Sequence, residues 1–234
     1  VLATSIHGFA SRLEDFVDRE RNFTRDASHE LRTPLTVVKV AADVLAEEEG
    51  LSPFATRAVA RVQRAVRDME ALIESFLILA RETDVGLPDE DFVVNALAAE
   101  ELEKAQVLVA GKPVALRLVE DAQFALHAPT RVLSVMLSNL LRNACLYTER
   151  GTVVVPVGLR FVRLTDPGPR MSAEELARVY EPFYRGGRGG QGGHGIGLTI
   201  VRRLSERFGW PVRLESTPGA GTTATISFPN PQPL

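Results

Sequence analysis

The sequence predicts two architectures in tandem: a helical hairpin that pairs with a second copy into a four-helix bundle, and then an α+β sandwich. Residues 9–48 and 53–82 are rich in Ala, Leu, Val, Arg and Glu and contain no glycine, which is typical of two long helices. After an acidic stretch that also contains Gly and Pro, short apolar strands alternate with helices. We therefore expect one domain over residues 1–83 and a second over residues 84–234.

The two long helices each carry an apolar seam, in which apolar residues recur at alternating spacings of three and four. The seam residues are Leu31, Leu35, Val38, Ala42 and Leu45 in the first helix and Ala58, Val62, Ala65, Met69, Leu72, Phe76 and Leu79 in the second. Gly50 is a stop signal between the helices, and Ser52 before Pro53 is typical of an N-cap. One hairpin cannot bury such a seam alone, so we expect two copies to pair.

The second half reads as an α/β sandwich, with one mixed sheet covered on one face by helices. The expected helices span residues 92–110, 129–146 and 195–208. The expected strands span residues 113–119, 152–158, 159–166, 211–217 and 221–229, the last two forming a closing hairpin.

Composition excludes several classes of protein. A chain of 234 residues with 45% apolar and 24% charged residues is an ordinary globular sequence. A net charge of −3 gives no electrostatic reason to expect nucleic acid or an anionic membrane as a partner. The single cysteine, Cys145, rules out an intramolecular disulfide and favours a reducing compartment. No apolar run approaches the roughly 18 residues of a spanning helix. Because the chain begins at Val1 in a helical pattern, we expect a soluble piece of a longer protein.

The stretch "TRDASHELRTPLT" (residues 24–36) places an unusual group of residues on the first helix. His29 lies roughly 200° around the helix from the seam and is therefore expected to face solvent. Glu30 adjoins the imidazole, and Pro34 should bend the helix at the histidine at a cost of about 3 kcal/mol. A neutral imidazole nitrogen is a good acceptor for a phosphoryl group. A surface histidine without a role is the alternative interpretation.

These residues resemble a known family. "SHELRTPL" is similar to the H-box of sensor histidine kinases, and Glu30 with Thr33 matches the E-x-x-T pattern of their dimerisation domain. The other boxes follow in order: "NLLRNACLYT" (139–148) resembles the N-box, "DPGPRM" (166–171) the first glycine box, "EPFYR" (181–185) the F-box and "GGHGIGL" (192–198) the second glycine box. The resemblance implies a dimerisation and histidine-phosphotransfer hairpin followed by an ATP-binding catalytic domain.

The resemblance assigns ATP and Mg²⁺ to the second domain. Asn139 and Asn143 lie one turn apart on an apolar helix, where their amides would bind the triphosphate, with Asn143 as the Mg²⁺ ligand. Asp166 would accept a hydrogen bond from the adenine amino group, Gly168 would let the base approach the backbone, and Thr222 would support Asp166 from a neighbouring strand. Two amides that simply cap loops in the core are the alternative.

A glycine-rich stretch is expected to contact the phosphates. Its residues Gly193, Gly195 and Gly197 open a helix at Leu198, and free N–H groups at a helix start form an anion site. The resemblance places Phe183, Tyr184 and Arg185 in a mobile lid and gives nucleotide contacts to Tyr147 and Arg185.

Two residues depart from the family pattern. Leu146 stands where a lysine or another polar residue usually helps to hold the nucleotide, and leucine cannot contact a phosphate. Arg170 stands in place of the second glycine of D-x-G-x-G and either hinders the lid or contacts phosphate instead. We assign no role to the remaining histidines or to two core or edge residues: His7, His127, His194, Cys145 and Trp210.

The implied activity is a phosphoryl relay in which ATP phosphorylates His29 and the group passes to an aspartate of a response regulator. Glu30 would orient His29 and take its ring proton, and Thr33 could position water for dephosphorylation of the regulator. The expected partners are a second copy and a receiver domain. The expected location is the cytoplasmic part of an inner-membrane sensor, attached through an upstream segment. Two alternatives stay open: a degenerate kinase acting as a phosphatase or scaffold, and an ATPase of the gyrase or chaperone type.

Overall fold

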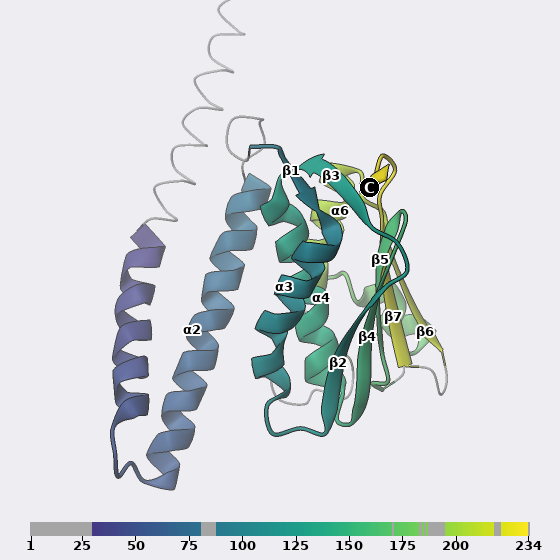
Figure 1. Ribbon diagram of the computed structural model, residues 1–234. Helices are drawn as coiled ribbons and strands as arrows, with labels where there is room; N and C mark the ends of the chain where they lie inside the picture. The colour runs from purple at the N-terminus through teal and green to yellow at the C-terminus, as the bar shows by residue number, and fades with distance from the viewer. Residues whose placement is uncertain are drawn as a thin grey trace, which may run out of the picture. The chain divides into compact units, whose positions relative to one another are not determined.

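The computed structural model describes residues 30–80, 88–169, 171–182, 184, 186, 195–217 and 221–233. The chain divides into two compact units, Val1–Asp84 and Val85–Leu234 (Figure 1).

The first unit is a helical hairpin. A helix over residues 30–47 is followed by a tight turn and by α2 (Pro53–Ala80). Gly50 adopts a left-handed φ of 88°, and the Ser52 hydroxyl accepts a hydrogen bond from the Ala55 N–H at 3.2 Å. The stop and the N-cap expected from the sequence are thus confirmed. The expected bend at His29 and the helix over residues 9–29 lie outside the described residues.

Polar side chains join the two helices in antiparallel order. The Lys39 ammonium lies 3.1 Å from a carboxylate oxygen of Glu70, and the Gln63 amide donates to Asp43 at 2.8 Å. Residues later in the first helix therefore pair with residues earlier in α2, as a hairpin requires. Exposed pairs of this kind contribute at most about 1 kcal/mol each, so they set the register more than they stabilise the unit.

The apolar seam divides between two surfaces. Leu35 and Ala42 are buried inside the hairpin together with Val66, which lies one position from the expected seam. The larger of the other described seam residues keep much of their surface exposed in the single chain: Leu31 55%, Val38 44%, Leu45 49%, Val62 43% and Met69 42%. Ala58 and Ala65 are exposed as well. The side chains of Leu72, Phe76 and Leu79 lie outside the description. An apolar stripe therefore remains uncovered along both helices.

A five-stranded mixed sheet forms the second unit, in the order β2-β4-β5-β7-β6. Its strands are β2 (Val114–Glu120), β4 (Gly151–Gly158), β5 (Phe161–Asp166), β6 (Val212–Thr217) and β7 (Gly221–Ser227). Only β2 and β4 are parallel within this sheet, and the other neighbours are antiparallel.

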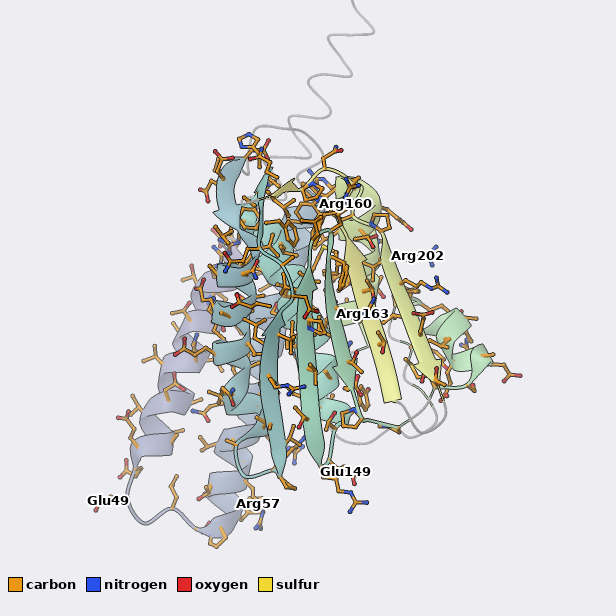
Figure 2. The ribbon with its side chains drawn as sticks, turned by 45° about the vertical axis from the view of Figure 1, so that its right-hand side comes forward. Glu49, Arg57, Glu149, Arg160, Arg163 and Arg202 are labelled. Carbon is orange, nitrogen blue, oxygen red and sulfur yellow. The ribbon has the colours of Figure 1, made fainter. Side chains whose placement is uncertain are left out.

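Three helices, α3 (Val94–Ala105), α4 (Thr130–Tyr147) and α6 (Gly197–Phe208), cover one face of this sheet (Figure 1). A 3₁₀ turn, η1 (Gln106–Val109), ends the first of them, and a short helix, α5 (Ala173–Arg178), packs near β6. Along β5, Val162 and Leu164 are buried while Arg163 between them is exposed, so the strand has one covered and one open face (Figure 2). The α+β sandwich predicted from the sequence is confirmed.

The expectation of one sheet was incomplete. A second, antiparallel sheet has the order β1-β3-β8, with β1 (Glu90–Val93), β3 (Phe124–Ala128) and β8 (Gln232–Pro233). These strands are two to five residues long, too short to show a clear period of two. The expected helix over residues 92–110 also begins later, at Val94, and ends in the 3₁₀ turn.

Aromatic side chains join the two sheets. The Phe228 ring lies 5.5 Å from Phe124 of β3 and 5.4 Å from Trp210, which precedes β6. All three side chains are buried, and the edge-to-face and tilted geometries are those that aromatic rings prefer. Trp210 is therefore a core residue, as is Cys145, which is fully buried.

None of the helices in the described ranges combines the length and the hydropathy that crossing a bilayer requires.

Candidate functional site

Helix α4 carries the two asparagines on one face, one turn apart. Asn139 is half-buried, and its amide nitrogen donates to the Val135 carbonyl at 2.8 Å. Asn143 is also half-buried, and its amide makes no hydrogen bond within the described part of the chain. The two amides thus differ: Asn139 is fixed by the helix backbone, whereas the polar atoms of Asn143 stay available.

The first asparagine meets the start of α6. A Cβ atom added to Gly197 would lie 2.8 Å from the Asn139 side-chain oxygen, which is closer than real side chains pack. Gly197 is the first residue of α6, and the preceding Gly195 adopts a left-handed φ of 69°. The structure therefore brings two motifs that are about 60 residues apart in the sequence into direct contact.

A carboxylate lies at the end of β5, beside the chain turn that follows it. The Gly168 N–H donates to Asp166 Oδ1 at 2.8 Å. A Cβ on Gly168 would lie 2.5 Å from that oxygen and 3.2 Å from the carbonyl oxygen of Tyr147, the last residue of α4. Only glycine fits at this position without movement of its neighbours.

Burial changes the acidity of this carboxylate. Removal from water raises the pKa of Asp166 to about 6, although the hydrogen bond from Gly168 acts in the opposite direction. Near neutral pH the group is mostly ionised, and a donor such as an amino group would stabilise the ionised form further. Asp166 is therefore suited to accept a hydrogen bond from a ligand.

Strand β7 lies beside β5 at this point and places Thr222 directly opposite Asp166. No hydrogen bond joins their side chains among the described residues. Gly221 adopts a left-handed φ of 76°, and a side chain there would collide with the Asp166 carbonyl oxygen. Ser216 of β6 donates to the Gly221 carbonyl at 3.2 Å and accepts from the Met171 N–H at 3.0 Å. The segment after Asp166 is thus bonded to β6 at Met171, while Gly221 of β7 lies closely against Asp166.

The start of α6 is held from the side. The Thr199 hydroxyl is nearly buried and donates to the Tyr180 carbonyl at 3.0 Å. No side chain caps the helix at Ile196, so the capping position leaves the first N–H groups to other partners. Leu198 is half-buried behind them. Gly193 and His194 lie outside the described residues.

The segment expected to form a lid begins with an unpredicted helix. Ser172 and Glu175 form a reciprocal capping box at the start of α5, with bonds of 3.1 Å and 2.7 Å. The Arg178 guanidinium lies 4.5 Å over the Tyr184 ring and 3.1 Å from the Glu181 carboxylate. These contacts order the base of the segment. Phe183 and Arg185 lie outside the described residues.

Leu146, which departs from the family pattern, lies at the end of α4. Its side chain is half-buried, and its carbonyl oxygen lies 3.4 Å from the ammonium of Lys112. The neighbouring Tyr147 is exposed, with 45% of its surface accessible. Arg170 lies outside the described residues. That it contacts phosphate in place of a lysine at position 146 therefore stays a prediction.

In the hairpin, Glu30 and Thr33 occupy the first exposed turn of the described helix. His29 lies outside the described residues. The neighbouring Thr36 hydroxyl donates to the Arg32 carbonyl at 2.9 Å, a local bond that is common for threonine in helices. The catalytic assignment of His29, Glu30 and Thr33 therefore rests on the sequence.

The structure thus brings Asn139 next to Gly197, and Asp166 next to Gly168 and the end of α4. Sequence reasoning missed Lys112 and Thr199, which hold the ends of α4 and α6. Nothing in the local sequence marks either residue, because their partners come from distant parts of the chain.

Comparison with known proteins agrees with this geometry. Residues 19–84 match the His Kinase A (phospho-acceptor) domain, and residues 129–232 match the histidine kinase-, DNA gyrase B- and HSP90-like ATPase family. The chain is 30% identical over 235 residues to the sensor protein QseC of Salmonella typhimurium, covering 97% of this chain and 51% of the relative. The chain belongs to the sensor histidine kinases.

Other sensor histidine kinases show the same extent of likeness. The sensor protein kinase PmrB of Pseudomonas aeruginosa is 32% identical over 231 residues, which cover 95% of this chain and 48% of PmrB. The chain therefore spans about half the length of the curated relatives that it matches.

Solved histidine kinase structures share the fold. Full-length ShkA in complex with AMPPNP superposes with a TM-score of 0.67 at 24% identity, covering 90% of this chain and 46% of ShkA. The histidine kinase AdeS of Acinetobacter baumannii gives a TM-score of 0.59 at 18% identity, covering 86% of this chain and 98% of AdeS.

Proposed function

We propose that this chain is the kinase core of a sensor protein, in which ATP phosphorylates His29 and the phosphoryl group passes to an aspartate of a response regulator. Residues 1–83 would carry the accepting histidine and residues 84–234 would bind the nucleotide. Family membership supports the general assignment, and the contacts around Asp166 and Asn139 support the nucleotide site.

The observation that carries the proposal is the pair of close approaches at Gly168 and Gly197. At each glycine a Cβ would crowd a polar side-chain oxygen, of Asp166 in the first case and Asn139 in the second. Glycines that leave such oxygens uncovered, beside the half-buried Asn143 amide, would form a cradle for a flat base at one end and for phosphates at the other.

Each residue of this cradle has a distinct task. The Asp166 carboxylate would accept a hydrogen bond from the adenine amino group, with Gly168 leaving room for the ring and Thr222 and Tyr147 beside it.

The phosphates would lie at the start of α6. N–H groups there would be offered to them by Gly193, Gly195, Gly197 and Leu198, and Arg185 would approach from the lid. Asn143 would hold Mg²⁺, which when bound would neutralise charge on the triphosphate, and Asn139, one turn before it, would bind the nucleotide.

The transfer step would take place at His29. Its free ring nitrogen attacks the γ-phosphorus while the bond to the β–γ bridging oxygen breaks and ADP leaves. Glu30 orients the ring and accepts the proton from the other nitrogen, so a neutral phosphohistidine ring remains. A carboxylate of the response regulator then displaces the histidine from the phosphorus, and in the reverse role Thr33 would position water against the phosphorylated regulator.

The uncovered stripe on the hairpin supports a homodimer. Val38, Val62 and Met69 each keep more than 40% of their surface exposed, although their spacing is that of a helical bundle. A second copy would cover the stripe with an identical one, because a two-fold interface pairs the same surface on both subunits.

A second candidate function is a degenerate kinase that acts as a phosphatase or scaffold. Leu146 favours it, because a half-buried leucine offers no hydrogen-bond donor to a phosphate. Weak nucleotide binding would then limit autophosphorylation while leaving the histidine hairpin able to dock a regulator.

Incubation with γ-labelled ATP and Mg²⁺ separates these functions. A working kinase should acquire label on protein that is stable in alkali and lost in acid, as expected of a phosphohistidine. A degenerate kinase should acquire none and yet remove phosphate from a phosphorylated regulator. Release of free phosphate without protein label would instead identify an ATPase and contradict both proposals.

A further inference from the structure

The C-terminal end of α4 lacks a basic residue of its own in the last turn. A helix leaves its last carbonyl oxygens without intrahelical partners, and a cation near them is favourable for both hydrogen bonding and the helix dipole. In this protein the cation comes from outside the helix. The Lys112 ammonium lies 2.9 Å from the Cys145 carbonyl oxygen, 3.4 Å from that of Leu146 and 3.5 Å from that of Thr148.

The backbone that presents Lys112 is itself fixed. Its N–H donates to the Val109 carbonyl at 2.9 Å, and its carbonyl accepts from the Val114 N–H at 2.8 Å. Gly111, immediately before it, adopts a left-handed φ of 78°, which glycine tolerates best. The turn between η1 and β2 therefore aims one lysine at the end of α4.

The end of α4 forms one wall of the proposed adenine site. The Tyr147 carbonyl lies so close to Gly168 that an added Cβ would stand 3.2 Å from it. Gly168 in turn donates to the Asp166 carboxylate. Burial is the main reason for the raised pKa of Cys145, but Lys112 lowers that pKa and Asp166 raises it, so both charges act on the same turn. A shift of this turn would move the carboxylate and the backbone that face the base.

We propose that Lys112 is a positioning residue of the nucleotide site: by bonding the last carbonyls of α4 it holds Tyr147 against the Asp166–Gly168 turn and so sets the adenine-binding end. This inference rests on the proposed function. It assigns no contact between Lys112 and the nucleotide, because the ammonium is directed at the helix carbonyls.

The test is ATP binding by calorimetry on the 234-residue chain, in two backgrounds. Lys112→Met should weaken ATP binding about tenfold in the wild-type background, a change of one decade in the dissociation constant. It should weaken binding less than about twofold in an Asp166→Asn background, where the adenine contact is already lost. Lys112→Arg should restore most of the affinity, because arginine can also donate to the carbonyls.

A matched control is Lys104→Met. Lys104 also pairs with carboxylates, those of Glu100 and Glu101 of α3, but among the described residues it makes no hydrogen bond to the end of α4. Its loss should leave ATP affinity unchanged. Thermal midpoints without nucleotide should be measured for each variant, since a purely structural lysine would lower the midpoint and leave affinity intact.

Equal weakening by Lys112→Met in both backgrounds, or a lowered thermal midpoint with unchanged affinity, would overturn the positioning role while leaving the proposed function intact. Absence of ATP binding by the wild-type chain would instead remove the proposed function and this inference with it.

Discussion

The Gly168 N–H and the Asp166 carboxylate form a 2.8 Å hydrogen bond across the turn after β5, and this bond leaves the second carboxylate oxygen for another donor. Burial raises the pKa of Asp166 to about 6, so the carboxyl group becomes protonated just below neutral pH. A protonated carboxyl group accepts an amino hydrogen bond less well than a carboxylate does.

The first prediction is that ATP affinity falls as the pH decreases from 7 to 5, approaching about tenfold per pH unit below the pKa. ATP affinity falls rather than rises on acidification because the pKa of Asp166 is raised. In the free protein this carboxyl binds a proton more readily than an ordinary aspartate does, and ATP binding must displace that proton. Calorimetry across this range should show the decline. Asp166→Asn should bind more weakly at pH 7 and lose the part of the pH dependence that this carboxyl causes. An identical profile in both proteins would contradict the assignment.

The second prediction concerns Gly197. Alanine usually stabilises a helical position relative to glycine by up to about 1 kcal/mol. Here its methyl group would displace the Asn139 side-chain oxygen, which lies 2.8 Å from the added atom. Gly197→Ala should therefore leave the free energy of unfolding within about 1 kcal/mol of wild type and yet weaken ATP binding. Denaturant unfolding and calorimetry check the two parts, and unchanged affinity would show that this contact lies away from the nucleotide.

The third prediction concerns the hairpin. Val38 belongs to the apolar seam and is 44% exposed, whereas Val40 is 56% exposed and lies on another face of the same helix. Val38→Asp should weaken dimerisation by at least about a hundredfold, because a charge would be buried against the second copy. Val40→Asp should not. Sedimentation of both variants measures the difference, and a monomeric wild-type chain would contradict the bundle.

The fourth prediction concerns the departure from the family pattern at Leu146. A lysine there would add a charged hydrogen bond to phosphate, which is worth about 1.5–3 kcal/mol, or roughly ten- to hundredfold in affinity. Leu146→Lys should therefore tighten ATP binding, whereas Leu146→Met, of similar length without charge, should not. If Arg170 already fills this role, Arg170→Gly should weaken binding and Leu146→Lys should restore it. Equal effects of Lys and Met would remove the electrostatic explanation.

Local sequence predicted much of the fold because local interactions decide those parts. Ser52 caps α2 as expected, because a cap depends on neighbours within three residues. The predicted boundaries of α4 and β4 lie within one residue of those in the structure for the same reason. The helix α5 was missed although Ser172 and Glu175 have the spacing of a capping box, since six residues show too little periodicity.

The parts that sequence could not predict depend on contacts between distant segments. The strands of the second sheet are short, and each forms because it pairs with a strand distant in the sequence. In one such pair, Asp91 of β1 lies opposite His127 of β3. The family resemblance assigned Asn139 and Gly197 to the same nucleotide, but their direct contact was not predicted, because it depends on how α4 and α6 pack. Lys112 gave no local sign of its role, because its partners lie more than 30 residues away.

The central claim is that His29 accepts the phosphoryl group, and the four histidines of this chain allow a direct test. His7→Gln, His29→Gln, His127→Gln and His194→Gln should each be incubated with γ-labelled ATP and Mg²⁺, and the acid-labile label on protein measured. We expect His29→Gln alone to lose the label and still dimerise by sedimentation, with the other three variants at the wild-type level. The account would be contradicted if His29→Gln kept the wild-type level of label. It would also be contradicted if one of the other three variants, in which His29 is intact, lost the label.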